Sequence, residues 1–387
     1  MALSGTQNLI DHPYCEKNRM RSILPSFRES WPGLLAIIVI ALFCDLPGIP
    51  WPFTVHDLLA YIDNILPPIQ GRGLFIDLLH FNYVVICLSV GIIIRNVIGI
   101  PKSWEPGLSY YSVFLHAGII MLGSQYLLRD MVKLGGLTII IMVVFVFGTA
   151  AFFVFLSRIF KLDDSLAGVL AAGFSMCGVT ALVATAPMIR AKNEQITYAI
   201  AATVSFGIIC MIILPPIARI FEVTQSSFGV ISATGVPNSA QVIASGFMYG
   251  FDAGKVAGFV NIGRIVLIPA GALFIYFLTM TKDVLQAERI NIWQTVKEKF
   301  PVYVIGFIIV WGANCLHLFP KPAVFAMEKV MIWLFSLSFV GLGLQTKLTE
   351  VRKAGLKGLI AGYVGGSVKL LLALLVIIAL MKYGLIE

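Results

Sequence analysis

Apolar runs of about 20 residues recur along the chain, separated by short links that hold charged residues or proline. Each run is about long enough to cross the hydrocarbon core of a bilayer as one helix. The pattern therefore predicts an all-α polytopic membrane protein with about eleven transmembrane helices. These lie near residues 31–46, 79–98, 108–128, 137–156, 166–188, 198–221, 228–249, 256–280, 302–318, 330–344 and 359–381.

The first 30 residues differ from the rest because acidic and basic side chains are frequent among them. They are too long and too acidic for the first part of a secretory signal. We expect a cytoplasmic N-terminal tail at 1–30 and a single transmembrane transporter domain at 31–387. Within that domain the segment Val55 to Ile65 is amphipathic and is predicted to lie on the membrane surface.

Basic residues set the predicted orientation, since Lys and Arg are retained on the cytoplasmic side of membrane proteins. With the N-terminus inside, seventeen of the 28 Lys and Arg residues fall on the cytoplasmic side and nine on the other. This arrangement places Lys161 and Arg219 inside, and Arg190 and Lys192 outside. The chain is predicted to be a multi-pass protein of the cell (inner) membrane with a cytoplasmic N-terminus and an outside C-terminus.

Composition supports the membrane class and excludes others. Of the 387 residues, 58% are hydrophobic and 12% are charged, which is outside the range of soluble domains. The net charge of +8 does not indicate a nucleic-acid partner, because the basic residues lie in small groups at helix ends. The six cysteines are dispersed, so neither a disulfide framework nor a metal site is predicted.

An interruption is predicted in the helix at about 165–188. The run AAGFSMCGVTALVATAPMIRAK has small and polar residues where a lipid-facing helix would have Leu, Ile or Phe. We predict a break between Phe174 and Gly178, after which a second half-helix starts inside the membrane. Irregular backbone at that depth needs protein or a water-filled cavity around it, and paired broken helices mark the sites of secondary transporters. Close helix packing through small residues is the alternative explanation.

A second interruption is predicted in the helix at about 228–249. The run TGVPNS, Thr234 to Ser239, cannot continue a helix. Proline removes a backbone donor and clashes with the preceding turn, but it fits the first position of a new helix. A half-helix is therefore predicted to start near Pro237, with Gln241 one turn in.

The chain also repeats at an offset of 220 residues, where LGSQYLLRDMVKLGGL (122–137) resembles LGLQTKLTEVRKAGLKGL (342–359). The matching positions are Gly123/Gly343, Gln125/Gln345, Leu128/Leu348 and Gly135/Gly355, with an echo one helix earlier at Asn96/Asn314. Seven predicted helices separate the copies, so the copies run in opposite directions. We predict inverted-repeat elements at about 79–158 and 300–381, as in many transporters.

Two cations, Arg264 and Lys369, are predicted at membrane depth. A charge there costs at least about 2.5 to 3.5 kcal/mol on insertion scales, so it faces protein and serves a function. Arg264 is the stronger candidate because Asn261 shares its helix face, whereas Lys369 could reach the interface from a displaced helix end. None of the twenty acidic residues is central in an apolar run, which argues against a cation exchanger. A buried guanidinium and two inward-pointing helix N-termini instead fit a small oxyanion.

The candidate substrate-binding residues lie at the two interruptions and beside Arg264. They are Ser175, Cys177, Gly178, Thr180, Gly235, Pro237, Asn238, Ser239, Gln241, Asn261 and Arg264, with Gln125, Gln345 and Lys369 as further possibilities. Each polar side chain could equally satisfy a local backbone group. No catalytic constellation, metal motif or nucleotide-binding motif is present, so neither enzyme activity nor a cofactor is expected. The expected partners are a small anionic substrate, the lipid bilayer and, by analogy, a second copy in a homodimer, with no nucleic acid.

These segments resemble the YeiH-type family of sulfate-exporter membrane proteins. GFSMCGVTALVATAPMIRAK is similar to that family's G-x-S-x-C-G-x-x-A segment followed by T-x-P-x-x-K-A-K, and VPNSAQVIASG, GRIVLIPAGALF and LGLQTKLTEVRKAGLKGL are similar to later segments. The resemblance runs from about Leu79 to Leu380. It implies an inverted-repeat fold related to the Na⁺/H⁺ antiporter and bile-acid symporter superfamily, and export of sulfate, sulfite or a small organosulfonate.

The sequence departs from that family at the second interruption, where Pro237 and Asn238 replace a His and an acidic residue. A titratable pair is thereby missing from the expected site, which leaves proton coupling open. The expected function is a secondary transporter that exports a small sulfur oxyanion by alternating access. The alternatives are a Na⁺- or H⁺-coupled organic-anion symporter and a membrane sensor that binds an anion without moving it.

Overall fold

A computed structural model describes residues 27–45, 54–65, 82–126, 128–279, 301–346 and 356–383, and every regular element in these ranges is a helix. Within these ranges, five helices are long and apolar enough to cross a membrane, and a pair bent by 53° provides a sixth if it counts as one crossing. The predicted fold class, an all-α polytopic membrane protein, is confirmed. The predicted number of eleven crossings is not.

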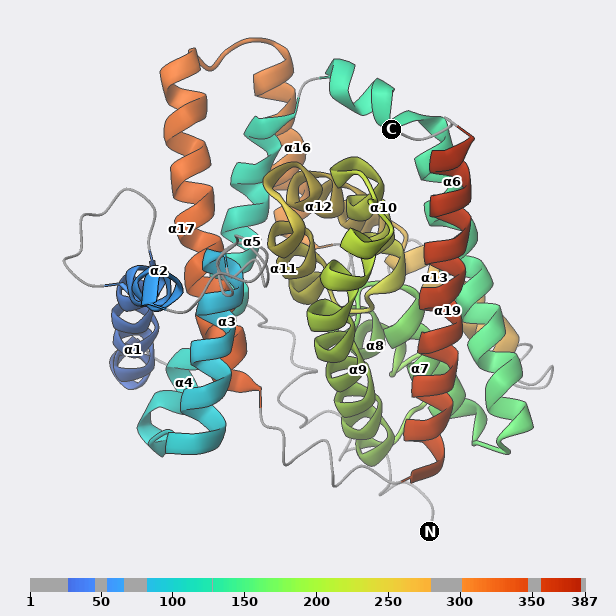
Figure 1. The fold of residues 1–387 in the computed structure, drawn as a ribbon. Helices are drawn as coiled ribbons and strands as arrows, with labels where there is room; N and C mark the ends of the chain where they lie inside the picture. Colours follow the sequence, from blue (N-terminus) through green and yellow to red (C-terminus); the bar gives the residue numbers. More distant parts are fainter. Residues whose placement is uncertain are drawn as a thin grey trace. The chain divides into compact units, whose positions relative to one another are not determined.

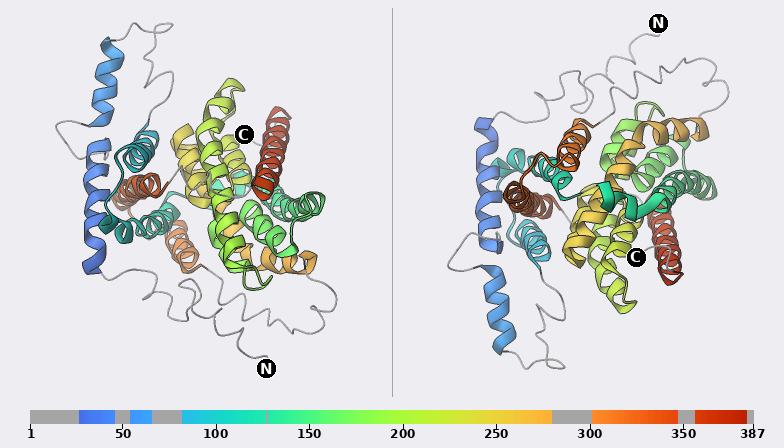
Figure 2. Two further views of the ribbon diagram at one scale, coloured as in Figure 1. Left: turned by 90° about the horizontal axis from the view of Figure 1, so that it is seen from below. Right: turned by 90° about the horizontal axis from the view of Figure 1, so that it is seen from above.

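The described helices form two compact units. The first unit combines the residues up to Ala117 with residues 332–347. Its elements are α1 (Phe27–Asp45), α2 (Val55–Ile65), α3 (Tyr83–Ile93), η3 (Ile94–Ile98), η4 (Lys102–Trp104), α4 (Glu105–Leu108), residues 111–117 of α5 (Tyr111–Leu122) and residues 332–345 of α17 (Lys321–Gln345). Figure 2 shows α1 and α2, in blue, end to end along one side of this unit. The bounds of α2 match the amphipathic segment predicted from the sequence, and its position on the membrane surface stays a prediction.

The second unit contains the predicted site and combines residues 118–331 with residues 348–387. Its elements are the end of α5, η5 (Gly123–Gln125), α6 (Leu128–Ile159), α7 (Asp164–Ser175), α8 (Val179–Thr185), α9 (Asn193–Ile220), α10 (Gln225–Gly235), α11 (Ser239–Tyr249), α12 (Phe251–Val266), α13 (Ile268–Thr279), α16 (Val302–Cys315), the start of α17, and α19 (Leu356–Lys382).

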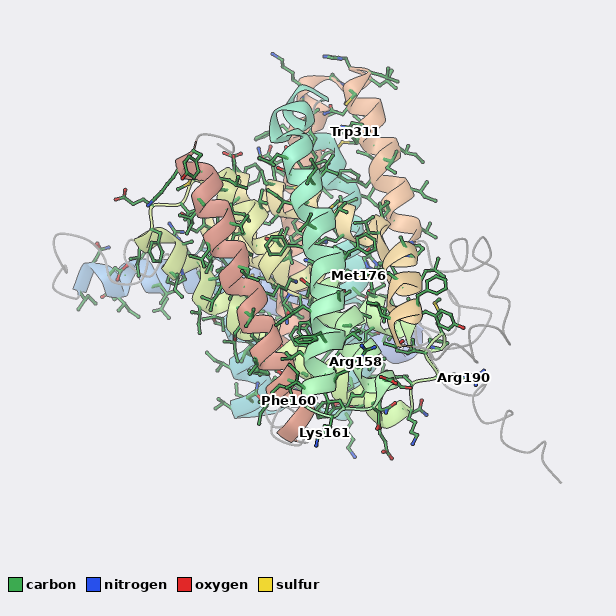
Figure 3. The ribbon with its side chains drawn as sticks, turned by 90° about the vertical axis from the view of Figure 1, so that its right-hand side faces the viewer. Arg158, Phe160, Lys161, Met176, Arg190 and Trp311 are labelled. Carbon is green, nitrogen blue, oxygen red and sulfur yellow. The ribbon has the colours of Figure 1, made fainter. Side chains whose placement is uncertain are left out.

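The first interruption turns the chain back on itself. The hydroxyl of Ser165 at the start of α7 donates to the carbonyl of Ile189 beyond α8, at 2.9 Å, so the two ends of this segment lie together. Twelve residues of α7 extend about 18 Å, roughly half the hydrocarbon thickness. Residues 164–190 thus form a re-entrant helical hairpin, hairpin 1. Figure 3 shows Arg190 at the same end of the molecule as Lys161, with Met176, at the turn, farther in.

The second interruption has the same form. The Ser232 hydroxyl of α10 donates to the carbonyl of Val242 of α11 at 3.0 Å, which requires the two helices to lie side by side. Nearer their outer ends, the rings of Phe228 and Tyr249 stack with centroids 4.0 Å apart. Residues 225–249 are therefore hairpin 2. Figure 1 shows the two hairpins entering this unit from opposite ends, with α9 running between the end that holds hairpin 1 and the end that holds hairpin 2.

The hairpins correct one part of the sequence-based topology. The two interruptions are present where they were predicted, but neither segment crosses the unit. Arg190 and Lys192 therefore lie at the same end as Lys161, not at the opposite end. The physical reason is that two apolar half-helices have the same summed hydropathy whether they continue or fold back, so a hydropathy window cannot distinguish a crossing from a hairpin.

Glycines pack in a similar way at two of the positions that the sequence repeat pairs, and the inverted repeat itself stays a prediction. In the first unit a Cβ on Gly343 of α17 would lie 2.5 Å from the carbonyl oxygen of Leu88 of α3. In the second unit a Cβ on Gly123 would lie 2.7 Å from the carbonyl oxygen of Phe307 of α16. Because no side chain fits at these distances, glycine allows the two backbones to touch in both places.

A pair of asparagines repeats the same relation. The Asn96 amide donates to the Thr346 carbonyl at 2.8 Å, and the Asn314 amide donates to the Tyr126 carbonyl at 3.0 Å. The partners Tyr126 and Thr346 follow the ends of η5 and α17. Each amide donates to a carbonyl that lies beyond a helix end and accepts no hydrogen bond from that helix. The two repeats therefore share a contact as well as a sequence pattern.

Candidate functional site

The turns of the two hairpins touch each other. The turn of hairpin 1 is Met176 to Gly178, and the turn of hairpin 2 is Val236 to Asn238. A Cβ on Gly178 would lie 2.9 Å from the Cα of Asn238. Gly178 also has φ +78, a conformation that side chains other than glycine rarely adopt. Glycine is therefore required here both for the reversal of the chain and for the close approach of the hairpins.

Arg264 of α12 caps the inner end of α10. Its Nη1 donates to the carbonyls of Ala233 and, at 3.0 Å, Val236, and its Nη2 donates to the carbonyl of Pro237 at 3.0 Å. The side chain is buried, with 1% of the residue exposed. The last carbonyls of a helix have no partner within the helix, and the buried guanidinium supplies one.

Lys369 of α19 has the corresponding role at hairpin 1. Its Nζ donates to the carbonyl of Phe174, in the last turn of α7, at 2.7 Å. The residue is 3% exposed. A helix C-terminus carries a partial negative charge of about half an electron, which a cation stabilises. Each hairpin thus has one buried cation at the end of its first helix, and the two cations come from different helices.

Three polar groups near the turns are buried and have no hydrogen-bond partner among the described residues. They are the hydroxyl of Ser175 in hairpin 1, the Oε1 of Gln241 in hairpin 2 and the Nδ2 of Asn261 in α12. Asn261 Oδ1 accepts from the hydroxyl of Ser239 at 3.1 Å, which leaves Nδ2 as the free end of the amide. Burying an unpaired polar group is costly, so such groups indicate a ligand that the protein holds.

Most of the residues predicted from the sequence gather at these turns. Hairpin 1 supplies Ser175, Cys177 and Gly178, hairpin 2 supplies Gly235, Pro237, Asn238, Ser239 and Gln241, and α12 supplies Asn261 and Arg264. Lys369 joins them. Thr180 lies on the first turn of α8 and is exposed.

Gln125 and Gln345, which were further candidate site residues, lie away from the hairpin turns. The amide of Gln125 donates to the hydroxyl of Ser124 and to the carbonyl of Val324, so it joins η5 to α17. Gln345 ends α17 in the first unit and is exposed. Gln241 lies beside the turns, but its amide donates to the carbonyl of Val204 at 2.9 Å, which points to a bridge between α11 and α9.

Sequence reasoning missed Thr203 of α9. Its hydroxyl is buried and has no partner among the described residues, and a Cβ on Gly173 would lie 2.6 Å from it. The signal in the sequence was weak, because one Thr in a long apolar helix commonly bonds its own backbone. The described part of the chain contains no cluster of three metal-ligating side chains.

Comparison with known proteins identifies a family and relatives that are similar to this sequence. The family model described as "Conserved hypothetical protein 698" matches residues 32–362. A UPF0324 membrane protein of Nitratidesulfovibrio vulgaris is 35% identical over 97% of this chain and 100% of its own length. The UPF0324 inner membrane protein YeiH of Escherichia coli K12 is 27% identical over 82% of this chain and 89% of its own length. No solved structure shows a significant match.

Proposed function

The chain belongs to the conserved hypothetical protein 698 family, and from this premise we propose that it is a secondary transporter. It exports a small sulfur oxyanion, which is sulfate, sulfite or an organosulfonate, by alternating access across the cell (inner) membrane. It works as a homodimer with the N-terminus in the cytoplasm. Its relatives are named as membrane proteins, and the identity of the transported ion is part of this proposal.

The observation that carries this proposal is the meeting of two hairpins, turn to turn, inside one unit. A ligand held at the turns can be reached from either end of the unit only if the surrounding helices move, which is the geometry that alternating access needs. The unpartnered Ser175 hydroxyl and Asn261 amide are donors. Together with Arg264 and Lys369 they favour an acceptor-rich anion.

Hydrogen bonding also refines the role of Arg264. Its two terminal nitrogens bond three carbonyls of hairpin 2, so the guanidinium shapes that turn as well as adding positive charge. A guanidinium has five N–H donors, which leaves donors for an anion. Direct contact between Arg264 and the substrate stays a prediction.

Export of an anion needs no coupling ion in a cell that is negative inside. The membrane potential contributes about 2.3 kcal/mol per charge per 100 mV. No carboxylate is bonded to either buried cation among the described residues, so the site offers no acidic group to hold Na⁺. An anion uniporter or exchanger fits these residues better than a sodium symporter.

Tracer counterflow in proteoliposomes tests the proposal. Vesicles loaded with unlabelled sulfate or sulfite should accumulate the labelled anion transiently, and empty liposomes should not. Gln345 lies outside the turns, so the Gln345→Ala variant should transport at the parent rate. Uptake that requires sodium would show a symporter, and binding without flux would show a sensor. Either result would overturn the exporter assignment.

A further inference from the structure

Two buried basic side chains lie at the hairpin turns without a carboxylate partner among the described residues. Arg264 bonds only backbone carbonyls, and Lys369 bonds the carbonyl of Phe174. Both are at least 97% buried, with 1% and 3% of their surfaces exposed. A buried charge is normally paired. A bound anion would supply a partner for both side chains.

The two charges belong to one cluster. Lys369 bonds the carbonyl of Phe174, two residues before the turn of hairpin 1, and Arg264 bonds the carbonyl of Pro237 in the turn of hairpin 2. The hairpins that the two cations cap touch at Gly178 and Asn238. A single small anion at the turns would therefore interact with both charges.

The partial charges of the helix ends do not change the net positive charge at the turns. Each turn brings together the C-terminal end of one half-helix and the N-terminal start of the next. Their partial charges are about half an electron each and opposite in sign, so they largely cancel. The charges of Arg264 and Lys369 remain.

Two of the three unpartnered groups, the Ser175 hydroxyl and the Asn261 amide nitrogen, are able to donate to an anion. Asn261 Oδ1 accepts from Ser239, and the two N–H donors of the amide have no partner among the described residues. The free hydroxyl of Ser175 is 1% exposed and is also able to donate. Such donors favour oxygen atoms that carry no proton, whereas the unpartnered Oε1 of Gln241 would accept from a ligand.

Building on the proposed function, we infer that the hairpin turns select a divalent oxyanion over a monovalent one of the same shape, with Lys369 as the residue that sets this preference. Sulfate is then a good ligand, and a sulfonate, in which a carbon group replaces one oxygen and one charge is lost, is a poor one. Of the three candidate substrates, sulfate and the sulfite dianion carry the two negative charges that the turns prefer.

Titration calorimetry with the purified full-length protein in detergent tests this inference. Sulfate is compared with perchlorate, which is also tetrahedral with four oxygens but carries one charge, and with methanesulfonate. The parent should bind sulfate about tenfold or more tighter than either monovalent anion. Lys369→Met should reduce that ratio by about tenfold or more, which corresponds to the loss of one interaction of ordinary strength. Lys369→Arg, which keeps the charge, should retain most of the ratio.

The outcomes separate the inference from the proposed function. Equal affinities of the parent for sulfate and methanesulfonate would overturn the charge selection and leave an exporter of sulfur anions standing. Binding of neither anion would overturn both. An unchanged ratio in Lys369→Met would remove Lys369 from the selection. If Lys369→Met does not fold, the comparison of anions on the parent and on Lys369→Arg still decides the main point.

Discussion

Replacing Gly178 by alanine tests whether the two hairpin turns touch. Alanine at φ +78 is held in a sparsely populated conformation, which costs about 1 to 3 kcal/mol. Its methyl group would also lie 2.9 Å from the Cα of Asn238, and such overpacking typically costs about 1 to 3 kcal/mol. We therefore expect Gly178→Ala to lower the free energy of unfolding by about 2 to 6 kcal/mol. The hairpins must also move apart, so sulfate affinity should fall.

Alanine substitutions at two other glycines separate the cost of the backbone conformation from the cost of overpacking. Gly99 has φ +79, and no atom lies within 4 Å of the place that a Cβ would take, so Gly99→Ala carries the backbone cost alone. Gly148 lies inside α6 with open space around it, so Gly148→Ala should be neutral or stabilising by about 0.5 to 1 kcal/mol. The expected order of stability is Gly148→Ala, then Gly99→Ala, then Gly178→Ala.

Thermal unfolding in detergent and sulfate titration measure the two effects. Gly178→Ala should have the lowest unfolding midpoint of the three and should be the only one with weakened sulfate binding. A Gly178→Ala protein as stable as Gly99→Ala, with parental sulfate affinity, would show that the turns do not touch at this point.

Three further outcomes follow from single contacts. Arg264→Gln should lower the free energy of unfolding by about 3 kcal/mol or more, because hydrogen bonds to a charged group contribute about 1.5 to 3 kcal/mol each; parental thermal stability would contradict the capping role. Asn261→Ala should weaken sulfate binding by calorimetry about tenfold, and Ser239→Ala, which keeps the free amide, should weaken it less. Hydrogen bonds from the hydroxyl and the backbone N–H of Thr54 lower the pKa of Asp57 below its ordinary 3.8. The support that Asp57 gives to α2 is thus present above pH 3.8 and lost as the pH falls through the lowered pKa, which hydrogen exchange of α2 at acid pH would detect.

Local chemistry explains what the sequence could predict. Apolar runs of membrane length follow directly from the thickness of the bilayer, and the helices lie where those runs are. The interruption near Pro237 was predictable because proline cannot continue a helix but can begin one. The glycines at Gly123 and Gly343 were visible as a repeat, since both remove a side chain at the same helix contact.

Long-range contacts explain the features that the sequence could not predict. Whether a broken helix continues or turns back depends on pairs such as Ser165 with Ile189, which no local pattern specifies. Burial of Arg264 was expected from its position in an apolar run, but its carbonyl partners 27 to 31 residues away in hairpin 2 were not. Lys369 was only a possible site residue, because its partner Phe174 is 195 residues away in the sequence.

The most direct test of the whole account is the side of the membrane on which the ends of each hairpin lie. Single cysteines at the exposed positions Asp164 and Glu194 flank hairpin 1, and cysteines at Ile220 and Asp252 flank hairpin 2. In a background without native cysteines, a membrane-impermeant maleimide should label the first pair from one face and the second pair from the other. Labelling of Asp164→Cys and Glu194→Cys from opposite faces would show that hairpin 1 crosses the membrane, and the proposed site would not exist.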